Sequence, residues 1–415
     1  MGQYTISILS HEKQSKIGPK EPENRQNLSF ERGLMRHSKS FKKPQNSAGR
    51  SLQLWLIGSV ALLFSFGLLM VFNTTSAEII DRFVEGGTHA PLLKQLLYGG
   101  VGISAGMIVY FWGYESLLKQ SPILLAITAL LLCFLFIPSI GQTINGSRRW
   151  LSIFGVSFQP SECVKILVPL VYIRWFLMQE KVIPFRSFAK ILMGLFIPII
   201  LILLEPDHGT TAILFSLLVV LFFLTRIRFV YWALPLLVIM SVGICGAYRL
   251  PYVKTRIQIY LHPELDLKGK GHQPHQAKIA AGSGQLFGRG LGESLQKLNY
   301  LPEARSDYIA AIFAEEMGFV GVLGLIALYL TLTFSGIAIA MRAQNPEGFL
   351  LASILTFLIS IQAFLNLGIV SGLLPSKGMT LPFFSQGGSS LVVNMIAFFL
   401  LLDIARKSKK SEEYG

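Results

Sequence analysis

Ten apolar runs constrain this chain more than any other feature of its sequence. Each is close to the 20 residues that cross roughly 30 Å of hydrocarbon as a helix. Charged residues make up only 14% of the chain, against about a quarter in soluble proteins. The sequence therefore predicts an all-α, polytopic membrane protein with ten transmembrane helices. The runs lie near residues 53–73, 91–112, 121–139, 163–178, 189–204, 211–225, 229–248, 319–341, 349–372 and 390–404.

Basic residues indicate how these spans are oriented. The net charge of +14 comes from Lys and Arg that cluster in both chain ends and in alternate connections, as the positive-inside rule requires. We therefore expect both termini in the cytoplasm and no nucleic-acid partner. Residues 1–50 hold ten Lys/Arg and no apolar run. This composition favours a disordered basic cytoplasmic tail that lies against anionic lipid, with no cleaved signal peptide.

The expected organisation is a transmembrane domain over residues 51–405 with a short cytoplasmic C-tail over 406–415. One connection in this domain, between the seventh and eighth helices, is long, about 60 residues over 249–308. Long loops are exempt from the charge rule, so its basic residues do not contradict an extracytoplasmic position. A long connection among short ones is usually functional. We expect the chemistry in this large extracytoplasmic loop.

Charges suited to phosphate groups follow the third span. Arg149 and Trp150 end one polar segment, and Glu162 and Lys165 begin the fourth span. Arg binds phosphate oxygens in pairs and Lys acts as a point charge, so this region could hold a diphosphate. The alternatives are an interfacial anchor for Trp150 and an i, i+3 ion pair between Glu162 and Lys165.

Two other segments carry weaker signals. Asp207, in the turn before the sixth span, favours a helix cap, and His208 lacks the companions that a zinc site needs. The glycines of residues 282–292 could turn backbone N–H groups toward an anion. Their spacing matches neither a P-loop nor a dinucleotide site, which leaves a flexible loop as the default interpretation.

Carboxylates gather just before the eighth span. If residues 303–315 are helical, Glu303, Asp307 and Glu315 fall roughly on one face. Asp307 or Glu303 could be a general base whose pKa is raised by partial burial. The alternative makes Asp307 a first-turn charge that the helix dipole favours. Glu315 and Glu316 are better explained as structural ion pairs with neighbouring spans.

The last outer connection contains Gly, Pro and Ser at membrane depth. This composition predicts a broken or re-entrant segment that lines a polar cavity or is buried in protein. Lys377 lies in it and is a second candidate anion ligand, although a snorkelling lysine explains it equally well.

Taken together, these motifs resemble the SEDS proteins (shape, elongation, division and sporulation), of the FtsW, RodA and SpoVE type. The resemblance covers about residues 50–405. Leu374-Pro-Ser-Lys-Gly and Leu381-Pro-Phe are more similar to the division or sporulation branch than to the elongation branch. The matching motifs are Asn145–Trp150, Gln159-Pro-Ser-Glu162, Glu205-Pro-Asp207, Gly282–Gly292, Leu301-Pro-Glu303 with Asp307, and Gly387-Gly-Ser-Ser390.

The resemblance implies a peptidoglycan glycosyltransferase of the bacterial plasma (inner) membrane, at the division septum. Such an enzyme polymerises lipid II at the outer face and releases undecaprenyl diphosphate. Its partners would be a class B penicillin-binding protein, which is a transpeptidase, and other division proteins. Asp307 matches the catalytic aspartate of the family and Trp150 its loop tryptophan. Charged positions that serve the substrate are matched by Arg149, Glu162 and Lys165, and Glu303 and Lys377 join them as substrate-binding candidates.

Some residues depart from the family pattern. Arg305-Ser306 stands where His-Thr is usual, Tyr308 replaces Phe, and Gln386 replaces Tyr. The aspartate is retained, so the expected reaction is inverting. In it Asp307 takes the proton from the 4-hydroxyl of the acceptor sugar. These replacements change the residues beside the aspartate at the expected acceptor site.

No metal site and no tightly bound cofactor are expected. The carboxylates form no dedicated metal cage, so a divalent cation, Mg²⁺ or Mn²⁺, would arrive with the diphosphate. Two alternative functions stay open. Lys165, Glu205 and Glu316 could mark the polar path of a lipid II flippase, or the protein could be a non-catalytic scaffold for the penicillin-binding protein.

Overall fold

The computed structural model describes residues 47–414, except 83–88, 138–140, 145–146, 154–155, 180–182, 249–259, 261–270, 298–300 and 302. The basic tail expected over residues 1–50 therefore lies outside the described residues, apart from its last four positions. Those four belong to the first described helix, which begins at Ser47.

Each of the ten apolar runs falls largely within a long helix of its own. Among the described residues, seven of these helices are long and apolar enough to cross a membrane, namely α2, α3, α4, α6, α11, α12 and α13. Helix α5 is not among the seven because it carries three charged residues, and α7 is not because it has only 17 residues. The ten are α2 (Ser47–Arg82), α3 (Ala90–Trp112), α4 (Tyr114–Leu135), α5 (Pro160–Leu177), α6 (Phe185–Leu204), α7 (His208–Leu224), α8 (Phe229–Tyr248), α11 (Ile309–Arg342), α12 (Pro346–Val370) and α13 (Gly388–Tyr414).

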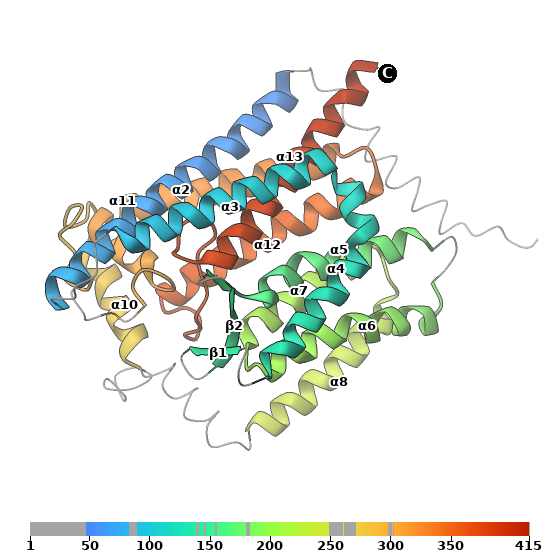
Figure 1. The fold of residues 1–415 in the computed structure, drawn as a ribbon, viewed down its shortest axis with the longest axis horizontal. Coiled ribbons are helices and arrows are strands. Elements are labelled where there is room, and N and C mark those ends of the chain that lie inside the picture. Colours follow the sequence, from blue (N-terminus) through green and yellow to red (C-terminus); the bar gives the residue numbers. More distant parts are fainter. Residues whose placement is uncertain are drawn as a thin grey trace, which may run out of the picture. The chain divides into compact units, whose positions relative to one another are not determined.

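Small residues allow the helices to approach one another closely. Figure 1 shows α3 running beside α13, and α2 beside α11. The buried face of α3 includes Gly99, Gly102 and Gly106. A Cβ atom on Gly106 would lie 2.1 Å from the ring of Phe399 on α13. Glycine at this position is what lets the two helices pack at close range without a hydrophobic driving force between them.

Helix α12 lies among the other helices, in contact with α5, α7, α11 and α13. Its most apolar stretch is buried over 61% of its length. Within this buried surface are three polar side chains, Thr356, Gln362 and Asn366. Buried polar groups in a membrane helix are costly unless they are bonded, so these three need partners.

A small antiparallel sheet connects α4 and α5. Its strands β1 (Gly141–Ile144), β2 (Ser147–Ile153) and β3 (Val156–Phe158) lie in the order β1-β2-β3. The prediction of an all-α protein was therefore wrong in this connection, because hydropathy over spans of 20 residues does not detect short strands. A local signal was present, since Asn-Gly between two extended segments is typical of a hairpin. We call the end of the helices that carries this sheet the sheet end.

The connection 249–308, where the structure describes it, contains a helix. Helix α10 (His272–Ser283) packs against α11. The glycine-rich segment that follows α10 runs along the start of α11, where Gly318 interrupts the helix with φ at +66°. The amide N–H of Arg289 donates to the carbonyl of Glu315, and Phe319 N–H donates to the carbonyl of Gln285.

These bonds explain the glycines. The break at Gly318 leaves backbone groups of α11 without helical partners, and at membrane depth such groups must be bonded to protein. The segment 285–290 supplies those partners. A Cβ atom on Gly288 would lie 2.0 Å from the Glu316 carbonyl oxygen, so only glycine fits. The amides of Arg289 and Gly290 thus bind α11, and the interpretation of this segment as an anion site or a flexible loop was wrong.

The carboxylates of Glu315 and Glu316 form ion pairs inside the protein, but with the long connection rather than with the neighbouring spans that were predicted. Arg289 Nε lies 3.7 Å from Glu315, and Lys297 Nζ lies 3.0 Å from Glu316. Glu315 also accepts hydrogen bonds from the backbone amides of residues 295 and 296. Both side chains are buried, so these partners compensate the cost of placing a charge at the start of α11.

Candidate active site

A cavity of about 490 Å³ opens at the sheet end. Its wall is formed by β2, the start of α7, helix α10, the turn before α11 and the connection between α12 and α13. Charged and polar side chains gather in it from segments far apart in the sequence. Those that line it are Arg149, Asp207, His208, Tyr260, Gln273, Lys278, Asp307, Tyr308, Ser376 and Lys377.

Asp307 lies in a tight turn just before α11. Its backbone N–H donates to the Glu303 carbonyl at 3.2 Å, and Tyr308 N–H donates to the same oxygen at 3.3 Å. Burial, followed by the charge of Glu303, raises the pKa of Asp307 to about 7. A carboxyl with this pKa can hold or release a proton near neutrality, as a general base requires.

The expected carboxylate face of a helix is not formed. Glu303 has φ at +56° and lies in a turn, and α11 begins only at Ile309 with Tyr308 as its N-cap residue. Asp307 therefore precedes the first turn of the helix, so the alternative of a first-turn dipole charge was also wrong. Glu303 is exposed, outside the cavity wall, and accepts a hydrogen bond from Ser306 at 2.8 Å.

Backbone and amide groups surround Asp307. A Cβ atom on Gly378 would lie 2.7 Å from Asp307 Oδ2, so the Cα of Gly378 closes one side of the carboxylate. The side-chain amide of Asn366 donates to the Asp307 carbonyl at 2.9 Å. Burial, then the charge of Asp307, raises the pKa of Tyr308 to about 12, so this phenol stays protonated beside the carboxyl.

The basic residues of the cavity come from three elements. Arg149, on β2, donates from Nε to the Glu205 carbonyl at 3.1 Å and from Nη2 to the Pro206 carbonyl at 2.7 Å. Lys377 comes from the α12–α13 connection and Lys278 from α10. The structure thus places three cations and Asp307 on one cavity wall.

Lys278 was not predicted, because no motif marks it. It reaches the cavity only through the packing of α10, which the sequence pattern does not reveal. Gly372, with φ at +76°, makes room for it, since a Cβ atom there would lie 1.9 Å from Lys278 Cε. Gly372 was thus the only mark in the sequence that a side chain packs closely against the outer connection, and it did not identify that side chain as Lys278.

The turn before α7 holds two carboxyls with different hydrogen-bond surroundings. Asp207 caps α7, accepting from Thr210 N–H at 3.2 Å and from its hydroxyl at 2.9 Å, which confirms the predicted cap. Glu205 is buried, and neither of its oxygens has a hydrogen-bond partner within the described residues. Burial and the Asp207 charge raise its pKa to about 8, against the opposing effect of Arg149.

Other predicted residues lie outside the cavity wall. Lys165 Nζ is 2.6 Å from Glu162 Oε2, and both side chains are buried at the start of α5. This geometry is the i, i+3 ion pair that was the alternative to substrate binding. Trp150 lies partly buried on β2, opposite Gln142 of β1. Substrate roles for these three residues stay predictions.

Metal ligands do not gather in the described part of the chain. No group of three or more His, Cys, Asp or Glu side chains lies close enough there to hold an ion. Asp207 and Asp307 line the cavity with three basic groups. A divalent cation that arrives with the phosphates of a ligand stays a prediction.

The fold and the cavity define an integral membrane protein with a candidate general base and a cluster of cations at the ends of its helices. The family model of the FtsW, RodA and SpoVE proteins, described as cell cycle proteins, matches residues 53–410. The chain belongs to this family, as its motifs indicated.

Relatives and solved structures agree with this assignment. The chain is 36% identical over 385 residues to the probable peptidoglycan glycosyltransferase FtsW of Legionella pneumophila, covering 90% of this chain and 96% of the relative. It is 35% identical to stage V sporulation protein E of Bacillus subtilis, covering 86% and 98%.

Two solved structures share the fold. One, from a study of the structural coordination of polymerization and crosslinking by a peptidoglycan synthase complex, has a TM-score of 0.67 at 24% identity and covers 85% of this chain and 97% of the other. The other is a mutant of the rod shape determining protein RodA of Thermus thermophilus, with a TM-score of 0.61 at 25% identity and coverage of 85% and 96%.

Proposed function

We propose that this chain is a peptidoglycan glycosyltransferase that polymerises lipid II during cell division and releases undecaprenyl diphosphate. The observation that carries the proposal is the position of Asp307 in one cavity with Arg149, Lys278 and Lys377. A base and a set of cations are the two things that glycosyl transfer from a diphosphate donor needs. Relatives named peptidoglycan glycosyltransferase support it.

Asp307 acts as the general base. Its carboxylate takes the proton of the acceptor's 4-hydroxyl while that oxygen attacks the anomeric carbon of the donor, and the bond from this carbon to the diphosphate breaks. The configuration at the anomeric carbon inverts. General-base help of this kind contributes on the order of 10² to 10⁴ in rate. A pKa of about 7 leaves enough carboxylate at neutral pH and a useful driving force for proton transfer.

The three basic side chains stabilise the leaving group. Negative charge develops on the diphosphate as its bond to the sugar breaks, and cations held in place beforehand lower the energy of that state. Arg149 is held by two carbonyls of the turn before α7, so its charge is fixed in position. Lys278 supplies an ammonium group from α10, and Lys377 supplies one from the α12–α13 connection. Mg²⁺ or Mn²⁺ carried by the diphosphate would add to them.

We assign the other predicted residues supporting roles. Glu303 raises the pKa of Asp307 through its charge rather than by contact with substrate. Lys165 reaches a phosphate only by leaving Glu162, its ion-pair partner on the same helix. Trp150 directly follows Arg149 on β2, and its contact with the substrate stays a prediction.

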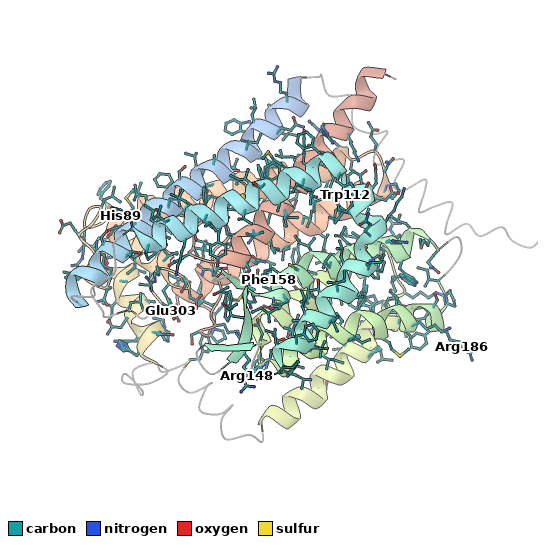
Figure 2. The ribbon with its side chains drawn as sticks, viewed as in Figure 1. His89, Trp112, Arg148, Phe158, Arg186 and Glu303 are labelled. Carbon is teal, nitrogen blue, oxygen red and sulfur yellow. The ribbon has the colours of Figure 1, made fainter. Side chains whose placement is uncertain are left out.

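The orientation follows from counting α5, α7 and α8 as spans as well. Ten spans place both termini on one side, and the basic tails place that side in the cytoplasm. The cavity, in the loop region 249–308 and at the sheet end, then opens on the extracytoplasmic face, where lipid II is used. Figure 2 shows Arg148 and Glu303 toward one end of the helices and Trp112 and Arg186 toward the other.

Buried charges favour the enzyme over a flippase. Two of the three side chains proposed for a flippase path are paired, Lys165 with Glu162 and Glu316 with Lys297, while the third, Glu205, lies in the turn beside the cavity. Charges that are satisfied by one another do not make a continuous polar path across the bundle. A class B penicillin-binding protein is the expected partner at the septum of the bacterial inner membrane, in keeping with the similarity in fold to a peptidoglycan synthase complex.

The test is polymerisation of lipid II by the purified protein, alone and with a class B penicillin-binding protein. Wild type should make glycan, and Asp307→Asn, which keeps the shape of the side chain but loses the base, should lose at least about a hundredfold in rate. Equal rates would reject Asp307 as the base. A folded wild-type protein that makes no glycan even with the partner would reject the enzyme and favour the scaffold or flippase.

A further inference from the structure

Asn366 occupies an unusual position for an amide. It lies in the last turns of α12, in a membrane helix, and its side chain is 1% exposed. Burying an amide in apolar surroundings is unfavourable unless its donors are bonded. The partners of Asn366 therefore show what the residue does.

The amide nitrogen of Asn366 bridges two segments of backbone. Nδ2 donates to the carbonyl of Asp307 at 2.9 Å and to the carbonyl of Met379 at 2.5 Å. Both partners are carbonyl oxygens, which only accept hydrogen bonds. The NH₂ group must therefore face them, so chemistry fixes which way the amide points.

The two bridged segments carry the groups of the cavity. One is the turn 303–308 with Asp307, and the other is the stretch 373–381 with Lys377 and Gly378. Neither is helix or strand at these positions, so single bonds hold one against the other: besides the Asn366 bridge, Gln386 N–H donates to the Arg305 carbonyl at 3.0 Å, and Tyr308 is hydrogen-bonded to Ser376. Gly378 also lies in close contact with the Asp307 carboxylate.

We propose that Asn366 is a positioning residue. Its amide holds the turn that carries the base and the segment that carries Lys377 at a fixed separation, so that the carboxylate and the ammonium group face the same ligand. This inference rests on the proposed function of Asp307 as a base. Asn366 would thus set the distance between the base and the lysine without itself contacting the substrate.

Gln362 offers a matched control. It lies one turn earlier on the same face of α12 and is 3% exposed. Its Oε1 accepts from Asn394 of α13 at 3.4 Å, so it bonds helix to helix rather than to either segment of the cavity. Gln362→Leu removes a buried amide from the same helix without touching the bridge.

The experiment compares Asn366→Leu, Asn366→Asp and Gln362→Leu in purified full-length protein. Asn366→Asp keeps the shape and replaces both N–H donors, and it carries the measurement if Asn366→Leu fails to fold. At saturating lipid II, both Asn366 variants should lose roughly tenfold to a hundredfold in kcat, because misplacement by about 1 Å costs this much. KM should change less than about threefold, and Gln362→Leu should stay near wild type.

Hydrogen–deuterium exchange supplies a readout that does not depend on activity. The amides of residues 303–309 and 377–381 should exchange about tenfold faster in the Asn366 variants, since the loss of a bridging bond frees both segments. Gln362→Leu should leave both segments at the wild-type rate. Raised exchange in the Asn366 variants alone is the signature of the bridge.

The outcomes separate this inference from the proposed function. Wild-type exchange in both segments of the Asn366 variants overturns the bridge whatever the activity. Raised exchange with unchanged kcat overturns its importance for catalysis. Raised exchange in a protein whose wild type makes no glycan supports the bridge and counts against the proposed enzyme alone.

Discussion

Gly378 and Asp307 are in such close contact that a methyl group on Gly378 would lie 2.7 Å from Asp307 Oδ2. The contact joins two segments about 70 positions apart in the sequence. It also makes the carboxylate sensitive to a single added carbon atom, which gives a direct test of the geometry.

Gly378→Ala should displace the Asp307 carboxylate and lower kcat roughly tenfold to a hundredfold. The rate of lipid II polymerisation at saturation is the measurement. Gly282→Ala is the control, because a Cβ atom there meets nothing within 4 Å. Equal rates in the two variants would show that the carboxylate adapts without loss, contrary to the rigid contact.

The activity should depend on pH through Asp307. A base must be deprotonated, so kcat/KM should rise about tenfold per pH unit below the pKa of about 7 and level off above it. Glu303→Gln removes a negative charge that raises this pKa, so the rising limb should move to lower pH. A midpoint that does not move in Glu303→Gln would contradict the electrostatic link between these two residues.

Removing cavity lysines should weaken stabilisation of the leaving diphosphate. Lys278→Gln and Lys377→Gln should each lower kcat/KM by roughly tenfold or more, since hydrogen bonds to charged groups contribute about 1.5–3 kcal/mol. Steady-state kinetics with lipid II checks this. Lys190→Gln at the exposed start of α6 is the matched loss of a charge away from the cavity, and a similar decline there would mean that net charge alone is responsible.

Gly318→Ala should destabilise the protein. A Cβ atom there would lie 2.2 Å from Gly288 N, and φ is +66°, so strain of about 1–3 kcal/mol is expected. Gly324→Ala lies in the same helix with nothing within 4 Å and should be neutral or stabilising, because Ala favours helix. Apparent Tm of the purified proteins measures the difference, and a Gly318→Ala protein as stable as Gly324→Ala would refute the account of the break.

Stability should fall as pH rises because of Glu205. Its pKa is about 8 in the folded protein and 4.5 ordinarily, so the folded state holds the proton more tightly. The contribution is full below pH 4.5 and is lost as pH rises to about 8. Asp307 acts with the same sign over a lower range. Glu205→Gln should therefore flatten the decline in apparent Tm between about pH 5 and 9, and an unchanged slope would contradict a protonated Glu205.

The helices were predictable because burial against lipid leaves a signal in every span. Hydropathy alone is a poor guide to α5. Glu162 and Lys165 lower its mean hydropathy, but they pair with each other, and the pair can be buried among the other helices. The sheet was missed because its strands have only three to seven residues. A hydropathy pattern taken over about 20 residues does not detect strands of that length. The family resemblance, which rested on ordered motifs, is confirmed by the family model.

The site was only partly predictable. Arg149, Asp307 and Lys377 were named from motifs, and the structure places them on one cavity wall. Lys278 and Asn366 were not proposed as site residues, because their roles arise from packing between segments that no local pattern connects. Glu303 was placed on a helical face that does not exist, since helical spacing holds only where the helix has begun.

The interruption of α11 at Gly318 has a mechanical consequence. The nine residues from Ile309 to Met317 form a short rod of roughly 13 Å, fastened at one end to the strip of backbone 285–290 and ending at the other in the turn of Asp307. Beyond the break, the rest of α11 is anchored among the other helices. One buried, rigid element thus connects the glycine strip to the turn of Asp307, so the position of the strip and the position of the carboxylate are set together.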